Sequence, residues 1–450
     1  MVTRSPTWRT LCSPAALCFA LALLAPSPAK ALGVGGDDGA APGGAPAHRL
    51  LRDNKSLSVW LGEHSPDVRA ARAEAHQAQA EARGARLFQN PVLDASLSDV
   101  PLGATTPPGL SFGKTAIFGV GLSETFELGK RGPRSAAADL RARAAGLETS
   151  STLAERIAVA RDALGRAVHL GLRLGVLAES LADAEHAATI EHTRLEQKAL
   201  SGMDYDRLLL DLANLRADFA RDQAEYTAAR ADCAAALAAE CDLTGTSEDD
   251  ILLVAPADAA HAEERLAGRA DVRSLGLQAA AAEHDATLAS NRAIPDVTLR
   301  VGYTRDQFVT SGDNANTLAF GLSLPLPIFD HGQHDAAKAK EHAIELGAER
   351  QALLEEARAD VRGLLSRKAA LASNIEVLER DTLPRSSGVL SSAERAFHEG
   401  GASLTDLLLA RRNHIALSLT RLDERFELFQ VQNELYRVLG LYPVAPEGKP

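Results

Sequence analysis

The sequence predicts a mainly α-helical fold that contains two β-hairpins, and three observations support this prediction. Most of the chain is rich in Ala, Leu, Arg and Glu, which are strong helix formers, and long stretches contain no proline. Two segments instead alternate apolar and polar residues with the period of a β-strand. The arrangement also occurs twice, because Asp67-Val68-Arg69 and Asn90-Pro91 have equally spaced counterparts in Asp271-Val272-Arg273 and Ile294-Pro295. A repeat of this length indicates duplication of a whole domain.

The first 31 residues have the features of a secretory signal peptide. Arg4 and Arg9 precede an apolar run over residues 14–25, and Ala29-Lys30-Ala31 follows it. That run is well short of the roughly 20 residues that a membrane-spanning helix needs. Residues 1–31 are therefore predicted to be a signal peptide, although the sequence does not specify the cleavage site to the residue. The Gly, Pro, Ala and Asp of residues 32–49 predict a flexible leader.

Composition excludes several classes of protein. The 450 residues carry a formal charge of −12, with 46% hydrophobic and 4% aromatic residues. The mean hydropathy of −0.10 excludes a protein built from many membrane-spanning helices. The negative charge argues against binding to a phosphate backbone, and the charged helices carry no aromatic platform for nucleic acid bases. We therefore expect no nucleic acid partner.

The first repeat is predicted to span residues 50–245. A helix begins at Ser65-Pro66-Asp67, with the proline in its first turn. Two strands follow at about 92–99 and 116–126, and then a helix from Arg131 to Lys198, roughly 65 residues and about 100 Å long. After a break at residues 200–204, a return helix is expected over residues 205–239.

The second repeat is predicted to span residues 267–441 and to have the same order of elements. A linker at residues 246–266 precedes it and a disordered tail at 442–450 follows it. A short helix, two strands, a long helix that Pro384 can kink and a return helix are expected at 270–290, about 296–304, about 316–325, 333–399 and 404–439. In each repeat the short and return helices together match the long helix in length, so they can lie end to end alongside it.

The four strands restrict what the fold can be. Each is amphipathic and roughly 10 residues long, which suits a tilted strand that crosses a bilayer. In lipid the edges of a sheet must be paired, so such strands occur in closed barrels of at least about eight strands. One chain supplies too few strands for a barrel. The strand count therefore predicts an oligomer, and three copies would supply about 12 strands.

Residues from about Leu57 to Leu441 resemble the TolC-type family of outer-membrane efflux ducts. The resemblance rests on short motifs that occur in the order typical of the family. They are Pro66-Asp67-Val68-Arg69-Ala70-Ala71 with Asn90-Pro91, Leu322-Ser323-Leu324-Pro325-Leu326-Pro327-Ile328-Phe329-Asp330 with Gly332, Gly400-x-x-Ser403-x-x-Asp406-Leu407-Leu408, and Leu435-x-x-x-Leu439-Gly440. In addition, the segment Phe126-Glu127-Leu128-Gly129-Lys130-Arg131 is similar to a turn of the heavy-metal (cobalt, zinc and cadmium, CzcC-like) branch.

The resemblance implies a homotrimeric duct of the bacterial outer membrane that extends into the periplasm. Long antiparallel α-hairpins would form a periplasmic α-barrel, and the strands would complete a 12-stranded trimeric β-barrel. The turns between helices would meet a periplasmic adaptor protein and an inner-membrane pump. The implied function is the outer-membrane channel of a tripartite efflux system, conducting substrates passively, with heavy-metal cations as the expected substrate.

The resemblance also assigns roles to residues at both ends of the repeats. Gly202, Gly400, Gly401 and Ser403 fall on the helical tips that would dock the adaptor. The alternative is that these glycines serve only the reversal of the chain, which favours a left-handed backbone. The residues at the strand-to-helix turns are Gly129, Lys130, Arg131, Pro325, Pro327 and Gly332.

Asp406 is the candidate for a periplasmic gate. In the family an acidic residue one turn beyond the second tip rings the closed aperture, and Asp406 matches that position. Three such carboxylates would attract cations, and their mutual repulsion would raise their pKa values. The alternative role for Asp406 is an N-cap of the return helix. A second acid common in the family is replaced here by Leu409, and the spacing of Asp206 from the first tip gives it no gate role.

Candidate chemistry elsewhere is sparse. Asp330-His331 and His334-Asp335 have a spacing that a metal site can use, but a solvated helix N-terminus explains them better. The chain has no nucleophile-base-acid pattern, phosphate loop or dinucleotide fingerprint, so we expect no enzyme, cofactor or metal site.

The cysteines of the mature chain are Cys233 and Cys241, because Cys12 and Cys18 leave with the signal peptide and have no small residue directly before them for lipid attachment. Eight residues along a helix cover about 12 Å, which exceeds disulfide reach. Two small buried thiols are therefore the favoured interpretation. A disulfide at a helix end, in an oxidising compartment, is the alternative.

Other functions remain open. A periplasmic coiled-coil adaptor would share the long helices but lack two amphipathic strand pairs, and a structural scaffold would not need strands that fit a bilayer. A general drug or type I secretion duct of the same family is a third alternative. The transported substrate, the pump and adaptor, and the gating state are not specified by the sequence.

Overall fold

The structure is a computed structural model that describes residues 45–105, 108–252, 261–308 and 314–443, all within the unit Pro42–Pro450. The predicted signal peptide lies outside these residues. The first repeat contains α3 (Pro66–Ala85), β2 (Val92–Ser98), β3 (Ile117–Phe126), α5 (Arg131–Glu196) and α6 (Gly202–Leu237). The second contains α9 (Ala270–Ser290), β5 (Val297–Asp306), β6 (Asn316–Ser323), α10 (Gln333–Val377), α11 (Leu383–His398) and α12 (Leu404–Val438). The predicted fold class, mainly helical with two β-hairpins and an internal duplication, is confirmed.

The long helix of the second repeat is interrupted where Pro384 was expected to kink it. A π-helical turn at Leu378–Thr382 separates α10 from α11. Proline has no N–H to donate, so the regular ladder of backbone hydrogen bonds must change next to Pro384. The segments of 45, 5 and 16 residues together equal the 66 residues of α5, which runs without interruption.

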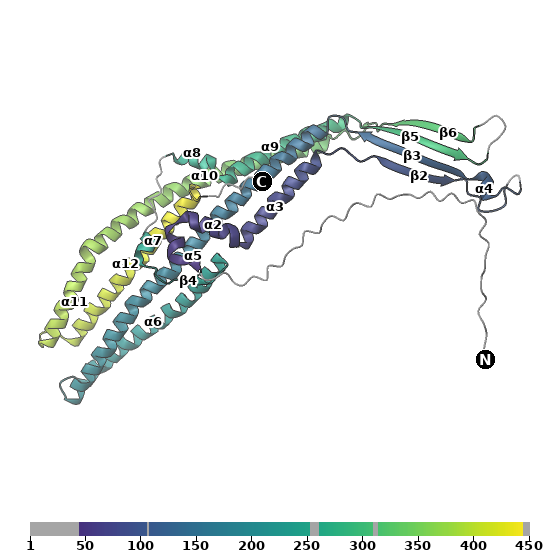
Figure 1. Ribbon diagram of the computed structural model, residues 1–450. Coiled ribbons are helices and arrows are strands. Elements are labelled where there is room, and N and C mark those ends of the chain that lie inside the picture. Colours follow the sequence, from purple (N-terminus) through teal and green to yellow (C-terminus); the bar gives the residue numbers. More distant parts are fainter. Residues whose placement is uncertain (1–44, 106–107, 253–260, 309–313, 444–450) are drawn as a thin grey trace, which may run out of the picture. The chain divides into compact units, whose positions relative to one another are not determined.

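The short and return helices lie end to end beside the long ones, as their lengths predicted. Helices α3 and α6 both contact α5, while α9 and α12 contact α5 and α10, and α11 contacts α12. Figure 1 shows the strands at one end of these helices and the α5–α6 and α11–α12 reversals at the other. Close approach of α12 to α5 depends on Gly165, because a Cβ there would lie 2.3 Å from Cε1 of Phe429.

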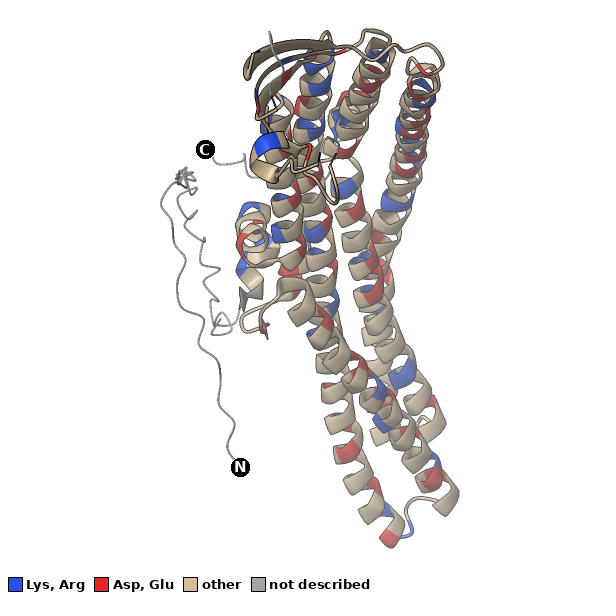
Figure 2. Ribbon diagram, turned by 90° about the vertical axis from the view of Figure 1, so that its right-hand side faces the viewer, with Lys and Arg blue, Asp and Glu red and all other residues tan. Residues whose placement is uncertain are grey.

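Ion pairs join the helices between these ends. Arg173 of α5 bonds Asp222 of α6 at 2.9 Å and Asp423 of α12 at 2.6 Å. His169 contacts the same Asp423 at 2.9 Å. Burial raises the pKa of Asp423, but the hydrogen bonds from His169 and Arg173 outweigh it, so the pKa is lowered and the network stays charged at neutral pH. Figure 2 shows acidic and basic residues along the whole length of the helices.

The four long strands form one antiparallel sheet in the order β2-β3-β5-β6. Each hairpin supplies two strands, and β3 pairs with β5 to join the repeats over ten residue pairs, from Ile117↔Asp306 to Phe126↔Val297. Strands β2 and β6 are the edges of this sheet. In the part of the chain that the structure describes, neither edge has a further partner strand.

Short elements surround the middle of the helices. They are β1 (Ala45–Pro46), α1 (Ala47–Arg52), α2 (Asn54–His64), β4 (Cys241–Asp242), α7 (Glu248–Leu252) and α8 (Ala262–Gly268), while α4 (Phe112–Thr115) and the 3-10 turn Asn291–Ala293 lie near the strands. The expected leader at 32–49 extends too far, because β1 pairs with β4 and Ala47 is fully buried. The expected tail also begins too early. Tyr442 is buried, with its hydroxyl donating to the carbonyl of Asn433 at 3.1 Å.

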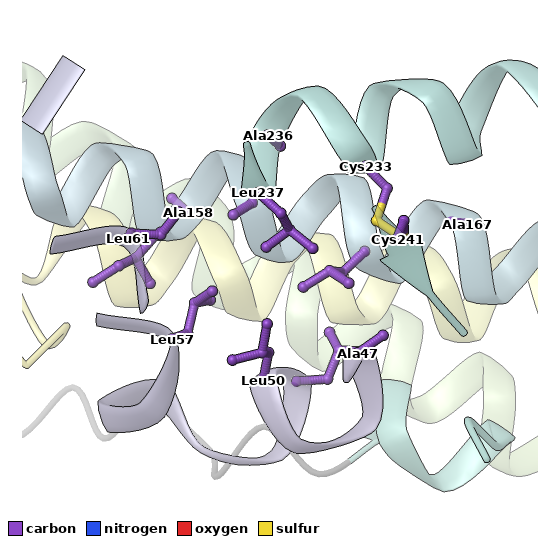
Figure 3. Close-up of a cluster of buried hydrophobic side chains, with 14 of the residues drawn as sticks. Ala47, Leu50, Leu57, Leu61, Ala158, Ala167, Cys233, Ala236, Leu237 and Cys241 are labelled. Carbon is purple, nitrogen blue, oxygen red and sulfur yellow. A yellow bond between two sulfur atoms is a disulfide. The ribbon is translucent and has the colours of Figure 1, made fainter. Parts of the chain in front are cut away.

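The interpretation of the two cysteines as free thiols is wrong, because Cys233 and Cys241 form a disulfide with Cα atoms 5.8 Å apart. Helix α6 ends at Leu237, and Ala238 takes a left-handed conformation that reverses the chain. The two residues are therefore not on one continuous helix, which was the assumption behind the distance argument. Figure 3 shows the bond within a cluster of buried apolar side chains, where Trp60 of α2 donates to the carbonyl of Leu237 at 3.0 Å.

Candidate functional site

The first helical tip joins α5 to α6. Ser201 is the N-cap of α6: its hydroxyl accepts from the N–H of Asp204 at 3.1 Å and donates to the Asp204 carboxylate at 2.7 Å. Gly202 is the first residue of the helix. The left-handed residue of this reversal is Lys198, and Gly202 does not have a positive φ. The expectation that Gly202 supplies a left-handed backbone is therefore wrong.

The second tip joins α11 to α12 and has the same local chemistry. Gly400 has a φ of +78°, and the N–H of Gly401 donates to the carbonyl of Ala396 at 2.7 Å, which closes the turn. Ser403 caps α12 by accepting from the N–H of Asp406 at 3.2 Å, and the Asp406 carboxylate accepts from the N–H and hydroxyl of Ser403. Ser403 and Asp406 form a capping box.

Both tips thus carry a Ser-x-x-Asp motif, Ser201 with Asp204 and Ser403 with Asp406. The sequence prediction did not include Asp204 at the first tip, where only the spacing of Asp206 from Gly202 was considered. The duplicated pattern was the signal that could have found it. Each tip therefore carries a carboxylate bonded to the N-cap serine of its own helix, and the carboxylate of the second tip, Asp406, is exposed.

Asp406 is a helix-capping residue, although Ser403 and not Asp406 occupies the N-cap position. Hydrogen bonds from the side chain and backbone of Ser403 lower the pKa of Asp406. The depressed pKa means that the capping interaction is complete at neutral pH and is lost as the pH falls through the lowered value. The carboxylate is thus charged at neutral pH. The gate role of Asp406 remains a prediction.

The two tips are also bonded to each other. Arg207 of α6 donates to the hydroxyl of Thr405 of α12 at 3.3 Å, and it also pairs with Asp204 at 3.3 Å. One turn further along, Arg412 of α12 pairs with Asp211 of α6. These contacts fix the spacing between the α5–α6 reversal and the α11–α12 reversal within one protomer.

At the strand-to-helix turn of the first repeat, polar contacts tie one repeat to the other. Gly129 has a φ of +72°, and its carbonyl accepts from Asn291 at 2.6 Å. Lys130 pairs with Asp296, which precedes β5, at 2.7 Å. The guanidinium of Arg131 lies 4.0 Å from the centre of the Phe88 ring. The structure therefore places all three predicted residues in contacts that hold the base of the sheet on the helices.

The corresponding turn of the second repeat depends on Gly332. Strand β6 ends at Ser323, before Pro325 and Pro327, which have no N–H to donate to a strand partner. Gly332 has a φ of +84°, and a Cβ there would lie 2.0 Å from the carbonyl oxygen of Ala289. Close contact between this turn and α9 therefore excludes any side chain at position 332.

The two faces of the sheet differ in chemistry. Rows of apolar residues cross all four strands in register on one face, for example Leu93, Leu122, Val301 and Phe320. Their side chains are about half exposed or more, at 67%, 52%, 44% and 76%. The opposite face carries mainly Gly, Ser and Thr. An exposed apolar face of this size indicates contact with lipid or protein.

Among the described residues, no group of three metal-ligating side chains is close enough to hold a metal ion. Asp330 accepts from the N–H of Gly332 at 2.9 Å, and Asp335 pairs with Arg292, so this pair of carboxylates has structural partners. None of the helices described is both long and apolar enough to cross a membrane.

We predict that Gly332→Ala prevents assembly of the native protein, because the new methyl group overlaps backbone and the φ angle is strained. Gly129→Ala is the matched control: its φ is also positive, but the nearest atom to the new Cβ is 3.5 Å away. The amount of folded protein recovered on purification measures both variants. Equal amounts for the two would contradict the close contact at Gly332.

Comparison with known proteins agrees with this architecture. A family model described as outer membrane efflux protein matches residues 262–441, which is the second repeat. The nickel and cobalt resistance protein CnrC of Cupriavidus metallidurans is 28% identical over 309 residues, covering 66% of this chain and 67% of CnrC.

Solved structures of outer-membrane channels share the fold. The structure of CusC has a TM-score of 0.75 with 18% identity, covering 86% of this chain and 91% of CusC. The outer-membrane channel OprN gives 0.73 with 20% identity over 88% of this chain and 92% of OprN. The MtrE channel of Neisseria gonorrhoeae gives 0.72 with 18% identity over 88% of each chain.

The family matched by the second repeat is one of outer membrane efflux proteins, and the OprN and MtrE structures are of outer-membrane channels. The matched repeat and the shared fold together cover both halves of the described structure. Residues 262–441 therefore match the outer membrane efflux protein family, and the described chain has the fold of solved outer-membrane channels.

Proposed function

We propose that the protein is the outer-membrane duct of a tripartite efflux system and that it works as a homotrimer. The observation that carries the proposal is the four-stranded sheet with an exposed apolar face and two edges, β2 and β6. Unpaired backbone groups at these edges would be costly in lipid. Pairing β6 of one copy with β2 of the next satisfies both edges and, with three copies, gives a barrel of about 12 strands.

The proposed substrates are heavy-metal cations. Support comes from the similarity to CnrC, which is named for nickel and cobalt resistance. The described residues offer no built metal site, which suits a passive duct in which a pump selects the substrate. A periplasmic adaptor and an inner-membrane pump are the proposed partners, and the helical tips are the proposed docking points.

The function is tested in a strain that lacks the gene for this protein. The wild-type chain, expressed with its own adaptor and pump genes, is expected to restore tolerance to nickel or cobalt and to run from outer-membrane fractions as a heat-sensitive trimer. A monomer that stays in the soluble fraction would overturn the duct. A membrane trimer that restores tolerance only to organic drugs would retain the duct and overturn the metal assignment.

Asp406 is proposed to act as a gate residue in the trimer. We expect Asp406→Ala to raise single-channel conductance or weaken cation preference in planar bilayers, because three carboxylates would leave the aperture. Ser403→Ala is the control, since it removes the capping hydroxyl and keeps the carboxylate. If both variants conduct like the wild type, or if both change equally, Asp406 serves the helix N-terminus and not the aperture.

Gly202 is proposed to give an adaptor close access to the first tip. Its backbone needs no glycine, and a Cβ there would meet nothing within 4 Å in the protomer. Bulk at this position should therefore leave the protomer intact and obstruct only a partner.

We expect Gly202→Phe to reduce co-purification with the adaptor several-fold, Gly202→Ala to reduce it less, and both to keep the wild-type heat stability of the trimer. Undiminished adaptor binding by Gly202→Phe would exclude docking at this glycine.

A further inference from the structure

The polar face of the sheet carries few charges. Its residues are mostly Gly, Ser and Thr, and its ionisable members in the described strands are Asp94 of β2, Arg300 of β5 and Asp306 at the end of β5. Asp306 accepts from the N–H of Phe308 at 2.8 Å, so it is part of the turn that follows the strand. Arg300 is thus the one positive charge on this face of the described strands.

Arg300 reaches across a neighbouring strand to find its partner. Asp94 lies on β2, and β3 separates β2 from β5. The residue of β3 directly opposite Asp94 is Gly121. The Arg300 side chain passes over this glycine, and its Nη2 lies 3.7 Å from Oδ2 of Asp94. The ion pair therefore bridges three strands.

Glycines make room for this arrangement. A Cβ at Gly121 would lie 3.2 Å from Nε and 3.3 Å from Nη2 of Arg300, which is tighter than ordinary contact. Gly302 is paired with Gly121, and Gly321 is paired with Arg300 itself. These glycines have no side chains that would block the path of Arg300 across β3 to Asp94. Both partners remain accessible to solvent, with side-chain exposures of 57% for Arg300 and 42% for Asp94.

The charges on the apolar face are placed differently. Arg305 and Glu124 have the same orientation as the apolar rows, but they lie near opposite ends of the strands. Those positions correspond to the polar boundaries of a bilayer, where long charged side chains reach water. The Asp94–Arg300 pair lies near the same end of the sheet as Glu124, in the next rows of the ladder, but on the opposite face. A closed barrel would turn that face toward its water-filled interior.

We propose that Arg300 and Asp94 form a paired charge belt inside the barrel that sets the ion selectivity of its membrane-spanning part. This rests on the proposed function, since it requires the polar face to line a channel. Three copies would contribute three guanidinium groups and three carboxylates. Unopposed, the arginines would repel cations from the lumen. Asp94 offsets that charge, so the belt passes cations and anions without a strong preference.

The test measures the reversal potential of the reconstituted trimer in planar bilayers under a KCl gradient near 0.1 M. Asp94→Asn leaves Arg300 unopposed, and we expect the K⁺/Cl⁻ permeability ratio to fall about twofold. Arg300→Gln should raise the ratio by a similar factor, and the double variant should return close to the wild type. In 1 M KCl the differences should shrink, because the Debye length falls from about 10 Å to about 3 Å.

Arg305→Gln is the matched control, because it removes a positive charge from the other face of the same strand, and we expect no change in the ratio. Permeability ratios that do not differ among the wild type, Asp94→Asn and Arg300→Gln would overturn the charge belt while leaving a conducting duct.

A labelling experiment separates failure of the belt from failure of the duct. Charged methanethiosulfonate reagents should modify Arg300→Cys in intact outer membranes and should not modify Val301→Cys, which faces the opposite side. Cys233 and Cys241 do not react with the reagents, because they are bonded to each other in a disulfide. If Val301→Cys reacts and Arg300→Cys does not, the polar face does not line the channel, and both the belt and the proposed barrel are wrong.

Discussion

The rest of this structure depends on one constraint: the backbone N–H and C=O groups at the two edges of the sheet need hydrogen-bond partners. Four strands in the order β2-β3-β5-β6 leave two edges, and the apolar face of the same sheet is exposed. Lipid offers no hydrogen bonds to an unpaired strand, so a protomer of this kind is incomplete on its own. Duplication of one hairpin doubles the number of strands per chain, but it still leaves the sheet open.

The position of the strands determines where the long helices begin. Each long helix begins at a strand-to-helix turn, and Gly129 and Gly332 bring these turns against the end of α9 and the residues that follow it. Between the two ends, the ion pairs of Arg173 join α5 to α6 and α12, and the disulfide joins the end of α6 to β4. The two tips are thus placed relative to the sheet by contacts distributed along the whole helical body.

The tips combine a structural role and a proposed functional role in the same residues. Ser403 and Asp406 form the capping box that starts α12, and Ser201 and Asp204 do the equivalent work for α6. The Asp406 carboxylate, whose pKa the Ser403 hydrogen bonds lower, stays ionised at neutral pH and is exposed. Asp406 can therefore cap α12 and at the same time supply the negative charge that the proposed gate needs.

Local patterns in the sequence were enough to establish the helices, the four strands, the internal duplication and the kink next to Pro384. Each of these depends on periodicity, on proline or on residue spacing, which act over a few turns of the chain. Contacts between distant residues were decided by the tertiary structure. The disulfide required α6 to end at Leu237, and β1 required a partner in β4. The ion pair of Arg300 with Asp94 required Gly121 of β3 to lie between them. Strand register and packing bring such residues together, and no short-range pattern in the sequence connects them.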